Sequence, residues 1–142
     1  MIEVNKNIKV GTGVMIFKDG KILVGKRRNR HGHGEYSFPG GHLDYMESLE
    51  DCVKKEYLEE VGVKIKNIKF LCVSNETAYP PRHGILIAFT ADWKSGTPRD
   101  LPEERIGEWK WCDINKLPKP IFLPAKVMVQ AYKSKRNYYD KK

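Results

Sequence analysis

The chain has 142 residues, of which 40% are hydrophobic and 31% charged, and its formal net charge is +8. This length and composition predict one globular domain over residues 1–142 and exclude a collagen-like chain. No apolar run approaches the ~20 residues that cross a bilayer, and charges interrupt the N-terminus where a signal peptide needs an apolar stretch. We therefore expect a cytoplasmic protein with no membrane association.

The three cysteines are scattered, and none forms a C-x-x-C pair. A zinc ribbon or a disulfide framework is therefore not expected, and the cysteines are interpreted as small apolar residues in a reducing compartment.

The secondary structure is predicted from apolar patterns and turn residues. A hairpin turns at Lys18–Lys21, Ser48 caps a helix that Gly62 ends, and the basic tail 133–142 is expected to fray. Strands and helices alternate irregularly, which is typical of a mixed sheet covered by helices. Strands are expected at residues 10–17, 22–25, 35–38, 63–77, 84–93 and 109–114, and helices at 48–61 and 124–135.

Charge is unevenly distributed along the chain. Residues 41–63 contain seven acidic residues and two lysines, a net charge of −5, so the remainder carries +13. A basic body with one acidic patch suits a polyanion that is held through a divalent cation. The alternative is a solvated acidic helix face on a generally basic surface.

The acidic patch includes three glutamates with helical spacing. Glu56, Glu59 and Glu60 stand at i, i+3 and i+4, within an arc of about 100° on an α-helix. Carboxylates this close repel one another unless a cation lies between them, and oxygen ligands favour Mg²⁺ first and Mn²⁺ second. The alternative is an acidic surface helix that Lys54 and Lys55 neutralise.

The segment before this helix strengthens the metal interpretation. Gly40 and Gly41 end a strand, where glycine lets backbone atoms approach an ion or phosphate closely. From Gly41 the sequence reads G-x5-E-x7-K-E-Y-x-E-E-x-G-V over residues 41–63. This resembles the signature of the Nudix hydrolases, G-x5-E-x7-R-E-U-x-E-E-x-G-U, in which U is apolar. Every spacing is kept, and Lys55 stands where the family has arginine.

The resemblance implies an α/β/α sandwich with a mixed β-sheet. It also implies hydrolysis of a nucleoside diphosphate linked to another moiety, with a small nucleotide as the substrate. The implied metal ligands are the Gly40 carbonyl and the carboxylates of Glu56, Glu59 and Glu60.

Other signature positions have implied supporting roles. Gly41, Glu47 and Gly62 would shape the signature loop, Glu47 through a salt bridge or an outer-sphere metal contact, and Gly41 would also contact substrate. Lys55 would replace the arginine that orients the catalytic carboxylate of Glu56. Lysine lacks the planar fork that holds a carboxylate at two points, so reduced activity is expected.

A weaker resemblance extends over residues 10–123. Arg27 and Arg28 end a strand that the family places near the substrate phosphates, and they are candidate phosphate contacts. His83 and the P-E-E-R and W-K-W elements at 102–105 and 109–111 are similar to those of small MutT-like nucleoside-triphosphate diphosphatases, and His83 is a further candidate substrate contact. In that subgroup Glu104 would be an extra metal ligand or the general base, with Glu103 and Glu108 as alternatives.

These features favour hydrolysis of a nucleoside triphosphate to a monophosphate and pyrophosphate. ADP-ribose, dinucleotides and RNA 5′ ends remain alternative substrates. A third alternative is a nucleotide-binding or nucleic-acid-binding protein without activity, because the pI is about 9.4 and tyrosines interleave the basic tail. The general base, the number of metal ions and the oligomeric state stay open.

Overall fold

The computed structural model describes residues 6–28 and 31–140. Its core is one eight-stranded sheet with the order β3-β2-β1-β6-β5-β8, in which β4 also pairs with β1 and β7 with β2. β1 runs parallel to β6 and β8 parallel to β5, whereas the other pairs are antiparallel, so the predicted mixed sheet is confirmed. The elements are β1 (Lys9–Lys18), β2 (Lys21–Arg27), β3 (Tyr36–Ser37), β4 (Gly40–His42), α1 (Leu49–Glu56), η1 (Tyr57–Val61), β5 (Lys64–Glu76), β6 (Gly84–Ser95), β7 (Ile106–Cys112), α2 (Leu123–Ser134) and β8 (Tyr138–Tyr139).

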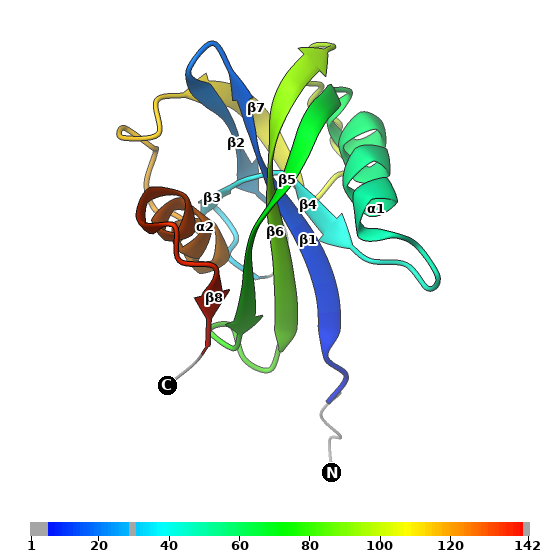
Figure 1. The fold of residues 1–142 in the computed structure, drawn as a ribbon, viewed down its shortest axis with the longest axis vertical. Coiled ribbons are helices and arrows are strands. Elements are labelled where there is room, and N and C mark those ends of the chain that lie inside the picture. Colours follow the sequence, from blue (N-terminus) through cyan, green and yellow to red (C-terminus); the bar gives the residue numbers. More distant parts are fainter. Residues whose placement is uncertain (1–5, 29–30, 141–142) are drawn as a thin grey trace.

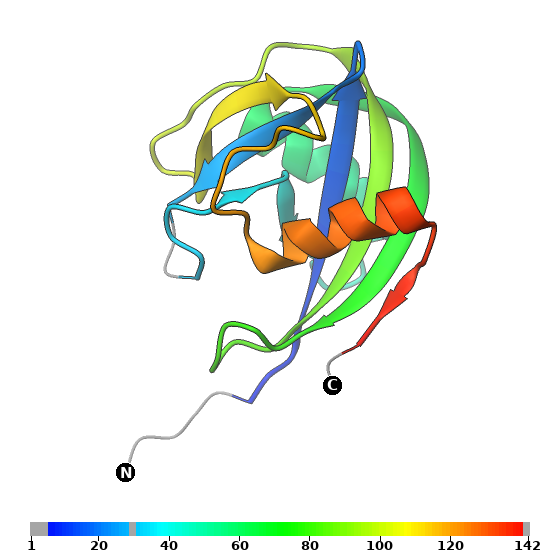
Figure 2. The ribbon, with the colours of Figure 1, turned by 90° about the vertical axis from the view of Figure 1, so that its left-hand side faces the viewer.

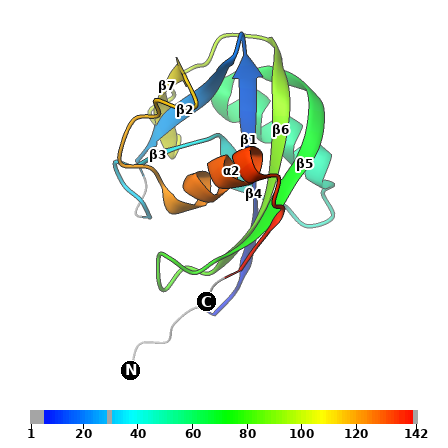
Figure 3. The ribbon, with the colours of Figure 1, turned by 60° about the vertical axis from the view of Figure 1, so that its left-hand side comes forward.

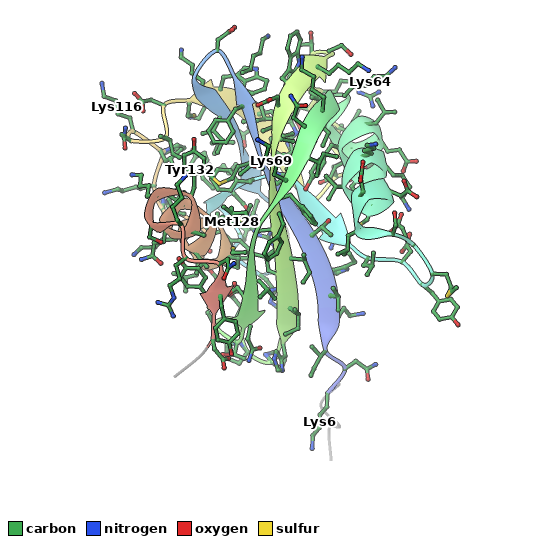
Figure 4. The ribbon with its side chains drawn as sticks, in the orientation of Figure 1. Lys6, Lys64, Lys69, Lys116, Met128 and Tyr132 are labelled. Carbon is green, nitrogen blue, oxygen red and sulfur yellow. The ribbon has the colours of Figure 1, made fainter. Side chains whose placement is uncertain are left out.

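The two long helices cover opposite faces of the sheet (Figures 1 and 2). Alternate residues of β1 point to opposite faces of the sheet. Val14 packs with Val53 on the α1 side, and Met15 packs with Met128 on the α2 side. In Figure 3, α2 lies across β1 and β6, and Figure 4 labels Met128 on this helix. A Cβ at Gly13 would lie 3.3 Å from Met128 Sδ, so this glycine lets α2 pack closely. The structure is the α/β/α sandwich expected from the sequence.

The first hairpin forms as predicted. Phe17 pairs with Ile22, and the turn places Asp19 at φ 50° and Gly20 at φ 77°. Two successive positive φ values define the tight turn that matches the twist of a hairpin, and Asp-Gly favours it.

The helix of the acidic patch differs from the prediction in its last turn. Ser48 caps α1 by accepting a hydrogen bond from the Asp51 amide at 3.0 Å, and Gly62 ends the helix at φ 84°, so both predicted ends are confirmed. Between them, residues 57–61 form one π-helical turn rather than an α-helical one. The i, i+3, i+4 geometry therefore does not apply across Glu59 and Glu60.

The basic tail, predicted to fray over 133–142, pairs with the sheet at Tyr138 and Tyr139, and its residues 141 and 142 lie outside the described part of the chain. Tyr138 and Tyr139 form β8, which pairs with Val73 and Ser74 of β5, and the Asn75 amide donates to Asp140 Oδ1 at 2.9 Å. Tyr139 also packs against the hydrophobic cluster beneath α2, which explains why the tail is held. No helix among the described residues is long and apolar enough to cross a membrane.

We expect the Tyr57→Phe variant to lose about 1 kcal/mol of unfolding free energy. The Tyr57 hydroxyl is fully buried and donates to the Pro39 carbonyl oxygen at 2.6 Å, which ties the helix to the chain before β4. Urea unfolding measures the difference. Tyr45, which is 95% exposed, provides the matched control Tyr45→Phe, and equal stability of both variants would contradict this role.

Candidate active site

The glycine pair of β4 brings the backbone against the acidic helix. A Cβ at Gly40 would lie 2.6 Å from the Thr12 carbonyl oxygen, and one at Gly41 would lie 2.7 Å from the Glu56 carboxyl group. A side chain at Gly40 would therefore collide with the backbone, whereas one at Gly41 would displace the Glu56 carboxyl group. The space that a side chain at Gly41 would fill is the space that the Glu56 carboxylate occupies.

Glu60 is the buried acid of the site, with 6% of its surface exposed. Burial, together with the neighbouring carboxylates of Glu104 and Glu56, raises the pKa of Glu60 to about 8, against the opposing charges of Arg105 and Arg27. Glu104 thus lies close enough to Glu60 for its charge to raise the pKa of Glu60. The two alternatives to Glu104, at positions 103 and 108, are both exposed.

The three signature glutamates do not converge as the sequence predicted. Glu59 is exposed whereas Glu60 is buried, and both lie in the π-helical turn that follows Glu56. Among residues 6–28 and 31–140, no three acidic, histidine or cysteine side chains are gathered closely enough to hold a metal ion.

The chemistry of the donors nevertheless fits a hard divalent cation. Glu56 lies against the Gly41 backbone and raises the pKa of Glu60, so two carboxylates and backbone oxygens share one region. Burial and the charge of Glu59 also raise the pKa of Glu56, whereas the charge of Lys55 lowers it. Carboxylate and carbonyl oxygens are the ligands that Mg²⁺ and Mn²⁺ prefer.

Lys55 holds the signature loop rather than Glu56. Its Nζ lies 2.9 Å from both Asp44 Oδ2 and Glu47 Oε2, and Glu47 Oε1 accepts the Asp44 amide at 3.0 Å. The Asp44 amide and Lys55 together lower the pKa of Glu47. Lys55 therefore affects Glu56 through its charge, and the direct contact expected of the family arginine is replaced by loop contacts.

A cleft of about 670 Å³ lies next to Glu60. Arg27, Arg82 and Arg105 line the cleft. Burial and the positive charges of Arg82 and Arg105 lower the pKa of Arg27 to about 10, which shows that these charges lie close together. Arg27 is held in place by donating from Nε to the His31 carbonyl at 2.9 Å and by stacking 3.8 Å from the centre of the Phe122 ring. A concave site with clustered positive charge attracts an anion such as a phosphate group.

The other predicted binding residues have different positions. His83 lines the cleft, and its Nε2 lies 2.6 Å from Asn75 Oδ1. Arg28 does not line the cleft; it forms an ion pair with Asp100, and its Nη1 donates to the Leu101 carbonyl at 3.1 Å.

The structure adds cleft residues that the sequence analysis did not identify: Glu76, Tyr79 and Arg82. No motif marks them, and only the pairing of β5 with β6 brings them to the cleft. Trp109 and Trp111 pack against the cluster beneath α1, as expected of core residues.

Comparison with known proteins identifies the family. The model of the NUDIX domain matches residues 7–132. The chain belongs to the Nudix family. Its Nudix fold and signature, both expected from the sequence, are thereby confirmed, and members of this family generally use divalent metal cations.

Curated relatives of this Nudix chain are named as hydrolases. It is 34% identical over 106 residues to the NAD-capped RNA hydrolase NudC of Chromobacterium violaceum, covering 74% of this chain and 38% of that protein. Identity to NudC of Pseudomonas syringae pv. syringae is 32% over 129 residues, covering 87% of this chain and 44% of the relative. The chain thus spans only about two fifths of the length of these relatives.

Solved structures resemble the whole Nudix domain. A MutT NUDIX hydrolase from Burkholderia pseudomallei superposes with a TM-score of 0.81 at 29% identity, covering 88% of this chain and 98% of the other. The NUDIX domain of Shewanella oneidensis NrtR, solved with ADP ribose, superposes with a TM-score of 0.74 at 20% identity, covering 92% and 90%. The second similarity shows the shared fold alone.

Proposed function

We propose that this chain hydrolyses the diphosphate linkage of nucleoside triphosphates to a monophosphate and pyrophosphate, in a reducing, cytoplasmic compartment. The observation that carries the proposal is the cleft in which Arg27, Arg82 and Arg105 lie beside the buried carboxylate of Glu60. Arginines bind phosphate oxygens, and the acidic wall suits the cation that accompanies them.

Each site residue has a role in this proposal. Glu56, Glu60 and the Gly40 carbonyl would hold Mg²⁺, or Mn²⁺ in its place, with Glu59 completing the set from its exposed position. Such a cation neutralises phosphate charge and lowers the pKa of bound water. Glu104 or Glu56 accepts the proton of the attacking water, and Arg27 stabilises charge on the phosphate oxygens. The Gly41 backbone and His83 contact the substrate.

A second candidate function is cleavage of a dinucleotide such as NAD, free or as an RNA cap. The names of the curated relatives favour it, at 34% and 32% identity. The basic surface is compatible with an RNA substrate, because phosphate neutralisation by lysine and arginine drives such binding. A protein that binds the nucleotide without cleaving it is the remaining alternative.

The test is a product analysis of the purified chain with nucleoside triphosphates, NAD, ADP-ribose and NAD-capped RNA. Each is incubated with Mg²⁺, with Mn²⁺ and with a chelator, and the products are separated by chromatography. We expect metal-dependent release of pyrophosphate from triphosphates with the highest kcat/KM. A higher kcat/KM on NAD or capped RNA would establish the second function, and binding without any cleavage would refute both.

Arg27, the last residue of β2, and the adjacent Arg28 offer a matched pair of variants. Arg27→Ala is expected to lower kcat/KM by about tenfold to a hundredfold, since Arg27 lines the cleft. Arg28→Ala is expected to stay near the wild-type value, because Arg28 pairs with Asp100 outside the cleft. Steady-state kinetics on the best substrate measure both, and equal losses would contradict this assignment.

A further inference from the structure

Glu76, the last residue of β5, is a buried acid outside the proposed metal site. Only 8% of its surface is exposed, and it lines the cleft. Its Oε1 atom has no hydrogen-bond partner in the described part of the chain. A buried carboxylate oxygen without a donor is costly, and native structures rarely retain one without a reason. The Glu76 Oε1 atom is therefore available to accept a hydrogen bond from a ligand in the cleft.

The strand register separates Glu76 from the acids of the helix. Glu76 pairs with Gly84 of β6, whereas Gly41 is aligned through Thr12 of β1 with Ile87 of β6. These positions differ by three residues along the strands, ~10 Å, and by three strand spacings across the sheet, ~14 Å. Metal–oxygen bonds are only about 2 Å long, so Glu76 cannot share a cation with Glu56. It lies at the end of the cleft that a substrate group remote from the diphosphate would reach.

A hydrogen-bond donor group lies next to Glu76. Arg82 Nη2 is 3.7 Å from the position of a Cβ on Gly84, the pairing partner of Glu76. The charge of Glu76 raises the pKa of Arg82 against the larger effect of burial. No hydrogen bond or ion pair links the two side chains within the residues that the structure describes. An acceptor and a donor are thus available side by side.

A fixed aromatic ring completes this end of the cleft. The Tyr79 hydroxyl donates to Glu35 Oε1 at 2.8 Å and accepts the Leu123 amide at 3.0 Å. The Tyr79 ring stacks on Phe122 with 4.9 Å between centroids and 29° between planes. These contacts hold the half-buried ring in the cleft wall, where a flat ligand such as a nucleobase can pack on it.

We propose that Glu76 recognises the exocyclic amino group of a nucleobase and so selects adenine and cytosine nucleotides over their keto counterparts, hypoxanthine and uracil. This inference rests on the proposed function, because it assumes a nucleotide in the cleft. A carboxylate only accepts hydrogen bonds, so with the exocyclic group facing Glu76 and the ring nitrogen facing Arg82 an amino base satisfies both residues, whereas a keto base in the same position places an oxygen against Glu76 and an N–H donor against Arg82. Arg82 supplies donors for the ring nitrogen beside the amino group. A ribose hydroxyl can both donate and accept, so its recognition would not require an acceptor and a donor side by side, as Glu76 and Arg82 are.

The test compares the binding of AMP with IMP and of CMP with UMP by calorimetry without added metal. Each pair differs in the amino or keto group, and a monophosphate has no diphosphate bond, so the outcome does not depend on hydrolysis. We expect wild type to bind each amino member about fivefold to a hundredfold more tightly. In Glu76→Gln the amide can present either a donor or an acceptor, so both ratios should fall towards one. Glu50→Gln, on the exposed face of α1, is the control that keeps them.

Several outcomes would overturn the proposal. These are ratios near one in wild type, no binding of any of the four monophosphates, or ratios that persist in a Glu76→Gln variant with a wild-type melting temperature. A loss in Glu76→Gln of discrimination between AMP and 2′-deoxy-AMP alone would assign the residue to the ribose instead. If the variant does not fold, the wild-type ratios decide. Base discrimination without hydrolysis of any nucleotide would refute the proposed function and leave this inference standing.

Discussion

Replacing Glu60 by glutamine is expected to lower kcat for diphosphate hydrolysis by at least about a hundredfold without unfolding the protein. Glu60 is the buried acid of the cleft, and its charge is coupled to those of Glu104 and Glu56. Glutamine keeps the shape of the side chain but removes the charge that would bind a divalent cation. Single-turnover kinetics at saturating metal measure the effect, and wild-type turnover in the folded variant would refute the role of Glu60.

Stability provides an independent readout for the same variant. The pKa of Glu60 is about 8 in the folded chain, whereas an unperturbed glutamate, as in the unfolded chain, has a pKa of 4.5. The folded chain therefore holds the proton more tightly. The stability of the metal-free wild type should therefore fall as the pH rises from about 4.5 to 8. Glu60→Gln should lack this contribution and melt at a higher temperature than wild type at pH 8. The exposed control Glu50→Gln should follow the wild-type curve.

Alanine at the two adjacent glycines of β4 is expected to affect different properties: Gly41→Ala lowers activity and Gly40→Ala lowers stability. In Gly41→Ala the new Cβ meets the Glu56 carboxyl group, which is the mobile end of a side chain. The Glu56 carboxylate must move to make room for the new Cβ, and a misplacement of about 1 Å in an active site costs about a hundredfold in rate. In Gly40→Ala the new Cβ meets the Thr12 backbone at 2.6 Å, so the strand pair must shift at a cost of about 1–3 kcal/mol in stability.

Kinetics and urea unfolding on both variants separate these effects. Gly41→Ala should keep a melting temperature near wild type while losing activity, and Gly40→Ala should lose stability first. Unchanged kcat in Gly41→Ala would mean that the position of Glu56 against this backbone does not matter for catalysis.

Features encoded over short stretches of sequence were predictable. The Asp19-Gly20 turn, the Ser48 cap and the Gly62 end depend on local backbone preferences, and the structure has all three. The irregular alternation of strands and helices likewise predicted a mixed sheet covered by helices, because each element must bury one face. The length of the signature identified the Nudix family, since its spacing is unbroken from Gly41 to Val63.

The details of the site depended on tertiary contacts. Arg27 and Arg28 are equivalent in sequence, yet packing on Phe122 and a hydrogen bond to His31 hold one in the cleft while Asp100 pairs with the other. The last turn of the acidic helix is π-helical, which α-helical spacing does not predict, and packing leaves Glu59 exposed while Glu60 is buried.

The family and the acidic helix were predictable because they follow from spacing along one segment, and the layers because they follow from the order of strands and helices. Which charges share the cleft, and that the Glu76 Oε1 atom at its far end lacks a hydrogen bond from the residues that the structure describes, became apparent only in three dimensions. Burial and electrostatic coupling arise between segments far apart in the chain, and Glu76 meets Arg82 and Tyr79 there because β5 turns back on β6. No local pattern carries that information.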